Sequence, residues 1–316
     1  MKKNEKADKL NTEPAGEDTP KTADRPKKTY AWVELLCFAA FWTILLFVLS
    51  YICDPISRGR ADLVQERDAY VAAAMTAPKD SIDVVVLGDS EAMVLLWPEL
   101  YEQRTGKNAF IAGQSGQIAA EAYYTLRSMK NQTPKTAVVE ADMLVSSANE
   151  RSEAIGSFNA ALQELLPVFR YHVMWKEAFG LKEPALIKHD RGFGKRLAAV
   201  AYTGGEYMTP SDGQARILTT SRKYFEKIRK LCEERNIRLV LVSGIVPKTF
   251  NYEKHNALQA LADQNGLTYI DLNEISVREE MGIDNETDFL DGGDHVNASG
   301  SIKVTEYLSK VLDNNE

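Results

Sequence analysis

The sequence is poor in the residues that build disulfide frameworks and metal centres. Only three cysteines occur among 316 residues, and none of them has the Cys-x-x-Cys spacing of a zinc or redox site. The four histidines are far apart in the sequence. Gly-Asp and Asp-His dipeptides and the many acids could belong to a metallophosphoesterase, but a two-metal site of that class needs several histidine and aspartate ligands. We therefore expect no metal and no cofactor.

The chain also lacks an excess of positive charge. It contains 38 Lys and Arg against 45 Asp and Glu, which gives a net charge of -7. Because binding to nucleic acid depends largely on neutralising phosphates, nucleic acid is not an expected partner. Hydrophobic residues make up 44% of the sequence, enough at this length for one large α/β domain with additional segments.

The N-terminal part of the chain has the composition of a membrane anchor. Residues 1–29 are polar and predict a disordered tail, whereas residues 30–53 are apolar except for Glu34 and are long enough to cross a bilayer as a helix. Eight Lys and Arg precede this run and few follow it, which predicts a single-pass protein with a cytoplasmic tail and an extracytoplasmic C-terminal domain. A signal peptide or a buried core helix are the alternatives, but residues 51–55 make a poor cleavage site.

The rest of the chain alternates short Val/Ile/Leu-rich segments with longer amphipathic ones, which is typical of βαβ units around a parallel sheet. We predict a helical stalk over residues 54–80, either a spacer or packed on the domain, and a three-layer α/β/α sandwich over residues 81–316. An irregular stretch at about 146–214 indicates an insert, either a lid or substrate wall or a structural subdomain. The predicted strands are residues 82–87, 109–112, 136–141, 238–243 and 268–272, with helices at 119–129 and 299–312.

The first predicted strand ends abruptly at Gly88-Asp89-Ser90. In parallel sheets ligands bind beyond the carboxyl ends of the strands, which is where this sequence places Ser90. We interpret Ser90 as a nucleophile. A serine hydroxyl is a weak nucleophile at neutral pH, so it requires a base within hydrogen-bonding distance and a third group that orients the base.

His295 is the histidine best placed to be that base. It lies between acids on a Gly-rich loop before the last predicted helix. Asp291 and Asp294 could both orient it; we favour Asp291, which can fold back across two glycines, because neighbouring side chains usually diverge. The segment could instead be a turn that caps the last helix through Asn297 or Ser299. The other histidines are expected to be structural or solvated: His172, His189 and His255.

Acyl transfer also requires donors aimed at the developing oxyanion. The backbone N–H of Ser90 is one candidate, and that of Gly113, in the loop after the second predicted strand, is another. Glycine at that position allows a close approach of the backbone. Gln114 or Gln117 could supply a side-chain amide, and Asp89 is grouped with them as an oxyanion or substrate-binding residue. An ordinary strand-to-helix turn is the alternative interpretation of this loop.

These segments together resemble the conserved blocks of the SGNH/GDSL hydrolase superfamily. The match consists of Gly88-Asp89-Ser90, residues 113–117 with the following Tyr123-Tyr124, and residues 288–297 with Gly300 and Tyr307. In this combination they are similar to membrane-anchored bacterial SGNH-like proteins that accompany MBOAT acyltransferases in modifying cell-envelope polymers. The resemblance covers about residues 82–312 and implies a flavodoxin-like sandwich. It also implies the roles of nucleophile, base, orienting acid and oxyanion donor for Ser90, His295, Asp291 and Gly113.

The resemblance implies a serine esterase or acyltransferase that acts on O-acyl groups, chiefly O-acetyl, of envelope polysaccharide through a covalent acyl-Ser90. An MBOAT-type membrane acyltransferase is then the expected protein partner. The sequence departs from the family pattern twice. The GxND block has no clear match at residues 139–143, where the third predicted strand ends, and Gly292 occupies the position three residues before the histidine at which the family usually has its acid. A non-catalytic SGNH-like module that binds glycans or scaffolds a membrane O-acyltransferase is therefore the alternative.

Overall fold

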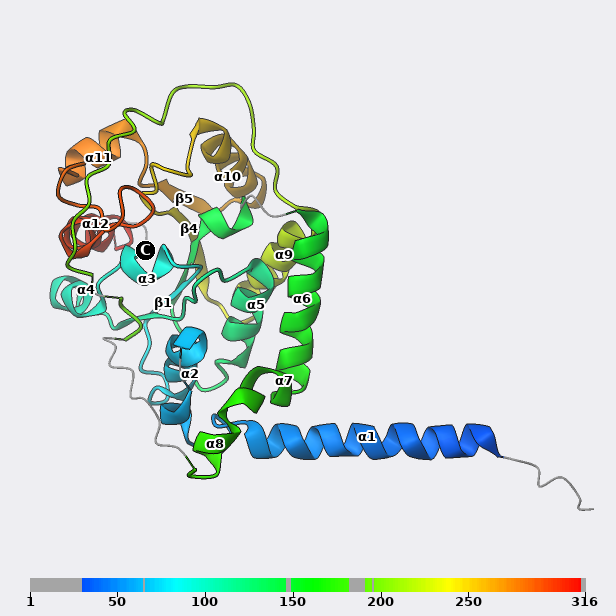
Figure 1. Ribbon diagram of the computed structural model, residues 1–316. Coiled ribbons are helices and arrows are strands. Elements are labelled where there is room, and N and C mark those ends of the chain that lie inside the picture. Colours follow the sequence, from blue (N-terminus) through cyan, green and yellow to red (C-terminus); the bar gives the residue numbers. More distant parts are fainter. Residues whose placement is uncertain (1–29, 65, 146–148, 182–190, 195, 314–316) are drawn as a thin grey trace, which may run out of the picture. The chain divides into compact units, whose positions relative to one another are not determined.

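A computed structural model describes residues 30–64, 66–145, 149–181, 191–194 and 196–313 (Figure 1). The chain divides into two compact units, residues 1–43 and residues 44–316, each of which is described by itself. The boundary falls within the helix α1, Ala31–Cys53, whose 23 residues are long and apolar enough to cross a membrane. A signal sequence near the N-terminus can meet the same criteria of length and composition, so these properties alone show an apolar N-terminal helix. The predicted tail, residues 1–29, lies outside the described residues.

The second unit is built on a five-stranded sheet in which all strand pairs are parallel. The strand order is β2-β1-β3-β4-β5. β1, β2 and β3 are buried along their whole length because helices cover both faces, as is usual for parallel sheets. The five predicted strands are confirmed, with small shifts at their ends. Their bounds are β1 Val84–Leu87, β2 Ala109–Ile111, β3 Thr136–Glu140, β4 Arg238–Ser243 and β5 Thr268–Asp271.

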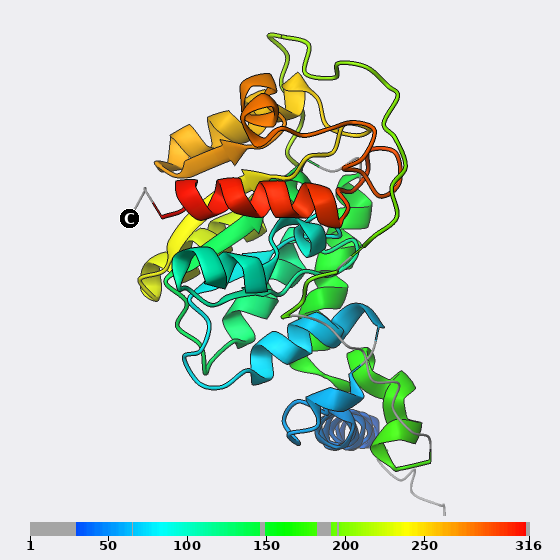
Figure 2. The same cartoon turned by 90° about the vertical axis from the view of Figure 1, so that its left-hand side faces the viewer.

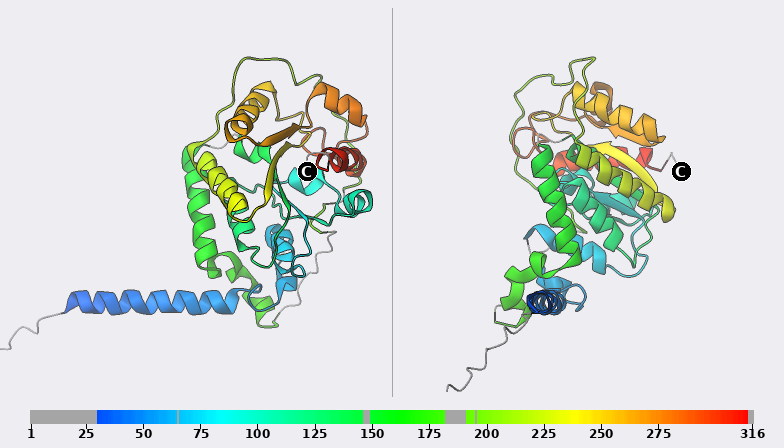
Figure 3. Two further views of the ribbon diagram at one scale, coloured as in Figure 1. Left: turned by 180° about the vertical axis from the view of Figure 1, so that it is seen from behind. Right: turned by 90° about the vertical axis from the view of Figure 1, so that its right-hand side faces the viewer.

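Helices pack on both faces of the sheet, so the predicted three-layer α/β/α sandwich is confirmed. Val85 and Leu87 point into one core, and Val84 and Val86 point into the other, as the alternation along a strand requires. Figure 2 shows the second face and the right panel of Figure 3 the first. The first face carries α2 Ala69–Thr76, α5 Ala119–Ser128, α9 Thr219–Glu234 and α10 Tyr252–Asn265, and the second carries α3 Ala92–Leu95, α4 Pro98–Thr105, α11 Ile275–Met281 and α12 Ala298–Val311.

The predicted stalk and insert both pack against this sandwich. Two short 3-10 helices, η1 Ala61–Leu63 and η2 Glu66–Asp68, precede helix α2. Because α2 buries Ala74 in the first core, residues 54–80 are more than a spacer. The insert begins with α6, which contacts α5 and α9 and forms an outer layer (Figure 3). The bounds of the elements between β3 and the end of the described insert helices are η3 Ala141–Leu144, α6 Glu150–Leu165, α7 Val168–Tyr171, η4 His172–Met174 and α8 Trp175–Ala178.

Candidate active site

A continuous chain of hydrogen bonds joins Asp291, His295 and Ser90. The His295 Nε2 atom lies 2.8 Å from Ser90 Oγ, and His295 Nδ1 lies 2.6 Å from Asp291 Oδ2. The imidazole side chain is 23% exposed and the Asp291 side chain 36%, so both can be reached from solvent. This is the nucleophile, base and orienting acid arrangement of serine hydrolases, brought together from segments 205 residues apart.

The turn after β1 places Ser90 at the edge of the sheet. Gly88 adopts φ +149°, and a Cβ atom at this position would lie 2.5 Å from Glu140 Cβ on the neighbouring strand β3. Only glycine fits this combination of backbone angle and close packing. The Gly88 N–H donates to Gln117 Oε1 at 2.8 Å, which fixes the turn from the second strand-end loop.

Asp291 both shapes its own loop and orients the base. An isolated antiparallel bridge pairs Phe289 with Val296, and we call residues 289–296 the triad loop. Asp291 Oδ1 accepts the backbone N–H of Asp294 at 3.0 Å and that of His295 at 2.9 Å. Burial acts to raise the pKa of the Asp291 carboxyl, but the hydrogen bonds from the His295 side chain and backbone and from Asp294 more than offset it, so the pKa is lowered. Asp291 is therefore ionised at neutral pH.

Asp294, the other candidate for the orienting role, faces a lysine instead. Its Oδ2 atom accepts from Lys248 Nζ at 3.0 Å, and the same ammonium donates to the Asp291 carbonyl at 2.7 Å. Asn297 caps α12 by accepting the N–H groups of Ser299 and Gly300. The helix-capping turn and the triad, which the sequence presented as alternatives, thus occur together.

The loop after β2 offers backbone donors rather than side-chain amides. Gln114 and Gln117 are buried, and their amide groups donate to Asp68 and to the Ala112 carbonyl, so neither amide is available to a substrate. The backbone N–H groups of Ser90 and Gly113 have no acceptor among the hydrogen bonds of the described residues. These two N–H groups remain the candidates for an oxyanion hole.

Gly113→Ala is expected to lower kcat/KM for ester hydrolysis by roughly tenfold with little change in Tm. A Cβ atom on Gly113 would lie 3.0 Å from the Gly88 carbonyl and 3.3 Å from that of Asp89, so it would push on the turn that carries Ser90. Gly244→Ala is the matched control, because the nearest atom to its Cβ would be 3.6 Å away. Equal activity of the two variants would show that the loop after β2 does not position the nucleophile.

Three carboxylates cluster behind the nucleophile, and the sequence did not single them out as a group. Oxygen atoms of Asp89, Glu91 and Glu140 lie within 4.8 Å of one another, and Glu91 Oε2 lies 3.4 Å from Ser90 Oγ. Burial raises the pKa of Asp89 and of Glu140 well above ordinary values, and the neighbouring carboxylates raise both further. The cluster could hold a cation, but the same geometry is stable when carboxyl groups keep their protons. Glu91 directly follows Ser90, and Glu140 is the last residue of the adjacent strand β3. These positions in the sequence could have indicated that the carboxylates lie near the nucleophile.

Asp142, just beyond this cluster, titrates near neutral pH. Burial raises its pKa to about 7, although the Lys254 ammonium, 3.5 Å from Oδ2, opposes the shift. Its ordinary value is 3.8. Because the folded-state pKa is the higher one, the stability that this group contributes is complete below pH 3.8 and is lost as the pH rises through 7.

Asp142→Asn is therefore expected to flatten the pH dependence of stability. The free energy of unfolding of the variant should rise relative to the parent by about 1–3 kcal/mol between pH 5 and pH 8, because asparagine carries no charge at either pH. Urea unfolding at the two pH values measures this difference, with the exposed Asp212→Asn as control. Parallel pH profiles of parent and Asp142→Asn would show that Asp142 does not titrate in this range.

The other histidines lie away from Ser90 or outside the described residues. His172 is exposed and contacts only the Val168 carbonyl of its own segment among the described hydrogen bonds, and His189 is outside the described residues. His255 instead forms a close pair with buried Asp271, at 2.7 Å, and this hydrogen bond raises the pKa of the imidazole. The expectation of structural or solvated histidines fits His172 and His255.

The end of the insert runs beside the triad loop. In residues 196–202 the Val200 N–H donates to the Phe289 carbonyl at 2.9 Å. The Tyr202 ring packs so closely on Gly293 that a Cβ atom there would lie 2.8 Å from it. This part of the insert therefore lies next to the loop that carries His295.

Comparison with known proteins gives distant likenesses of fold only. No protein-family model matches the chain, and no curated protein matches it. A Bacteroides fragilis protein described as a "putative acylhydrolase" is 12% identical, with a TM-score of 0.42, and the match covers 78% of this chain and 95% of that one. A "putative lipolytic protein of G-D-S-L family" from Desulfitobacterium hafniense is 11% identical (TM-score 0.38; coverage 72% and 98%). A protein named TesA is 13% identical (TM-score 0.37; coverage 73% and 98%).

Proposed function

We propose that the protein is a serine esterase or O-acyltransferase of the SGNH/GDSL type. The observation that supports this most directly is the unbroken hydrogen-bond chain from Asp291 through His295 to Ser90. The geometry brings a hydroxyl, a base and an ionised orienting acid together in the order that nucleophilic catalysis requires. A module that only binds glycans would have no need for this alignment.

The residues can carry out acyl transfer in two balanced half-reactions. In the first, His295 Nε2 takes the proton of Ser90 while Oγ attacks the ester carbonyl, and the Ser90 and Gly113 N–H groups stabilise the oxyanion. The tetrahedral intermediate collapses, and the departing alkoxide takes the proton from His295. In the second, water or another hydroxyl gives a proton to His295 and attacks the acyl-Ser90 ester. The bond between the acyl carbon and Ser90 Oγ breaks, Oγ takes the proton back from His295, and the acid or a new ester is released. Asp291 holds the Nδ1 proton throughout.

We further propose that the substrates are O-acyl groups, chiefly O-acetyl, of cell-envelope polysaccharide. The support is the sequence resemblance together with α1: a membrane-spanning helix preceded by a basic tail would leave residues 54–316 outside the cytoplasmic membrane, where such polymers lie. In that position an MBOAT-type acyltransferase in the same membrane could deliver the acyl group to Ser90. If water reaches the acyl enzyme, the protein hydrolyses the ester; if a carbohydrate hydroxyl reaches it, the protein transfers the acyl group to the carbohydrate.

Active-site labelling tests the proposal. The purified full chain should react with a fluorophosphonate, and mass spectrometry of the digest should place the label on the peptide that contains Ser90. The protein should also release acetate from an O-acetylated polysaccharide or from p-nitrophenyl acetate. Absence of labelling, or a label on another serine, would contradict the triad and favour the non-catalytic scaffold.

A further inference from the structure

Exposed apolar side chains gather in residues 173–181 of the insert, in and just after η4 and α8. Val173, Trp175, Phe179 and Leu181 are 69%, 46%, 62% and 68% exposed. Soluble proteins rarely expose several large apolar side chains in one short segment without a partner. A tryptophan among aliphatic and phenylalanine side chains, with Lys176 beside it, is the composition of segments that lie at a membrane interface.

This segment is tied to the end of α1. The Val168 N–H, at the start of α7, donates to Ser50 Oγ at 3.3 Å, and Ser50 is only 4% exposed. Both residues belong to the unit of residues 44–316. Ser50 lies in the last turn of α1, so the start of α7 contacts the end of that helix.

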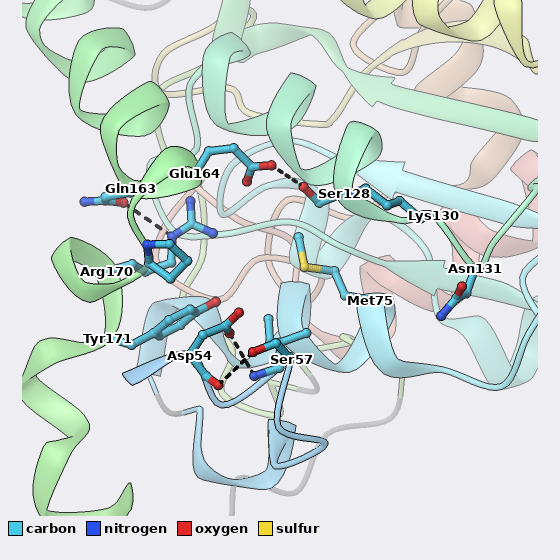
Figure 4. Close-up of a pocket in the computed structure, with 12 residues that line it drawn as sticks. Asp54, Ser57, Met75, Ser128, Lys130, Asn131, Gln163, Glu164, Arg170 and Tyr171 are labelled. Atoms are coloured by element: carbon cyan, nitrogen blue, oxygen red, sulfur yellow. Dashed lines mark hydrogen bonds between the residues drawn. The ribbon is translucent and has the colours of Figure 1, made fainter. Parts of the chain in front are cut away.

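A cavity of about 380 Å³ opens at the same place (Figure 4). Its wall includes Asp54, Ile56 and Ser57, the loop after α5, and α7. It combines apolar groups such as Met75 and Tyr171 with the cations Lys130 and Arg170. The size is within the range of ligand-binding pockets. The cavity lies beside Asp54, which directly follows α1, and beside α7, and none of its lining residues belongs to the triad.

Two cations and two carboxylates lie in this wall, and both kinds of group have partners within the protein. The Arg170 guanidinium donates to Gln163 Oε1 in a long bond of 3.4 Å, contacts the Tyr171 hydroxyl, and interacts electrostatically with Asp68 and Glu164. A guanidinium has five N–H donors in all. Glu164 accepts from Ser128 at 2.6 Å and from Arg127 at 3.2 Å. Asp54 Oδ1 accepts the N–H of Ile56 at 3.0 Å. Lys130 is exposed, so its ammonium group and the remaining N–H groups of Arg170 are the groups of this wall that an anion can meet.

We propose that the cavity and the four exposed apolar side chains form one phospholipid-binding surface. The headgroup phosphate binds at Arg170 and Lys130, and Val173, Trp175, Phe179 and Leu181 lie at the boundary between headgroups and acyl chains. This inference rests on the membrane anchoring that belongs to the proposed function. A second attachment beside α1 fixes the orientation of the catalytic domain on the membrane, which a single helix followed by a flexible linker would not.

Three single-cysteine forms of the full chain test the apolar part of the surface. In vesicles of phosphatidylcholine and phosphatidylglycerol, an NBD label is placed on native Cys37 in α1, on Val173→Cys, or on exposed Gln264→Cys in α10, with the other cysteines replaced by serine. We expect the Cys37 and Val173 labels to emit at shorter wavelength and to resist dithionite, and the Gln264 label to be reduced at once. A shielded Cys37 label with a Val173 label as accessible as that at Gln264 would overturn this inference alone. Accessible labels at both Cys37 and Val173 would overturn the anchoring as well.

The headgroup site is tested with Lys130→Gln and Arg170→Gln, and with Lys230→Gln on α9 as a matched control of equal charge change. Lys130 and Lys230 are both exposed, so these two substitutions leave the fold intact. Native mass spectrometry of protein extracted from the same vesicles in mild detergent measures the bound phospholipid. We expect the parent and Lys230→Gln to retain one phospholipid and Lys130→Gln and Arg170→Gln to retain it at least fivefold less often. Equal retention in parent, Lys130→Gln and Lys230→Gln would overturn the headgroup assignment.

Discussion

Ser90→Ala is expected to lower kcat for ester hydrolysis by about 10⁴- to 10⁶-fold. The substitution removes only Oγ, the atom that lies 2.8 Å from His295 Nε2, and leaves the turn after β1 with its Gly88 contacts. What remains should be the small rate enhancement that substrate binding and the backbone donors provide without a nucleophile. Initial rates with p-nitrophenyl acetate measure the loss, and Ser152→Ala, an exposed serine on α6, is the control.

The double variant Ser90→Ala with His295→Ala sharpens this expectation. Residues that act as one catalytic unit have non-additive effects, so the second substitution should cost little once the first is present. If the reductions in kcat caused by the two substitutions instead multiply in the double variant, His295 acts on its own, for example as the base for a water molecule. Rates of Ser90→Ala within tenfold of the parent would exclude an acyl-Ser90 intermediate.

Asp291→Asn is expected to reduce kcat/KM by about 10³- to 10⁴-fold. The carboxylate accepts the Nδ1 proton of His295 at 2.6 Å, which leaves Nε2 free to accept from Ser90. An asparagine that presents its NH₂ group to the ring stabilises the other tautomer, in which Nε2 carries the proton and cannot act as a base. The amide oxygen can still accept the two backbone N–H groups, so the triad loop should keep its conformation and the Tm should change little.

Asp294→Asn is the matched control for this prediction. Asp294 is three residues away and has the same charge, but its side chain pairs with Lys248 and lies outside the hydrogen-bond chain to Ser90. We expect less than a threefold effect on kcat/KM, because exposed ion pairs contribute little. A larger loss with Asp294→Asn than with Asp291→Asn would reverse the assignment of the orienting acid.

The strands and the triad could be predicted because their signals are local or follow from topology. A Val-rich run that ends at Gly88-Asp89-Ser90 predicts a buried parallel strand, and the edge rule for such sheets places Ser90 and His295 together. The choice of Asp291 needed only the geometry of a loop with two glycines. The segment up to α2 was harder, because the weak helical spacing of residues 54–80 does not show whether Ala74 faces solvent or a core.

The surroundings of the site could not be predicted because they depend on contacts between distant segments. Gln117 looks like a free amide in the sequence, but it serves the Gly88 turn from another loop. Glu140 meets Asp89 and Glu91 only because β3 lies next to β1. Gln114 likewise looks like a free amide in the sequence, but it donates to Asp68 in another segment.

Asp291 uses one oxygen for the base and the other for the backbone of the loop that carries the base. The position of the proton on the His295 imidazole and the folded conformation of the loop that carries it therefore depend on the same side chain. Local opening of residues 291–295 breaks both at once, while the sheet and its two cores stay folded. If the proposed function holds, the alignment of His295 with Ser90 can therefore be lost by opening a few loop residues, without unfolding of the domain.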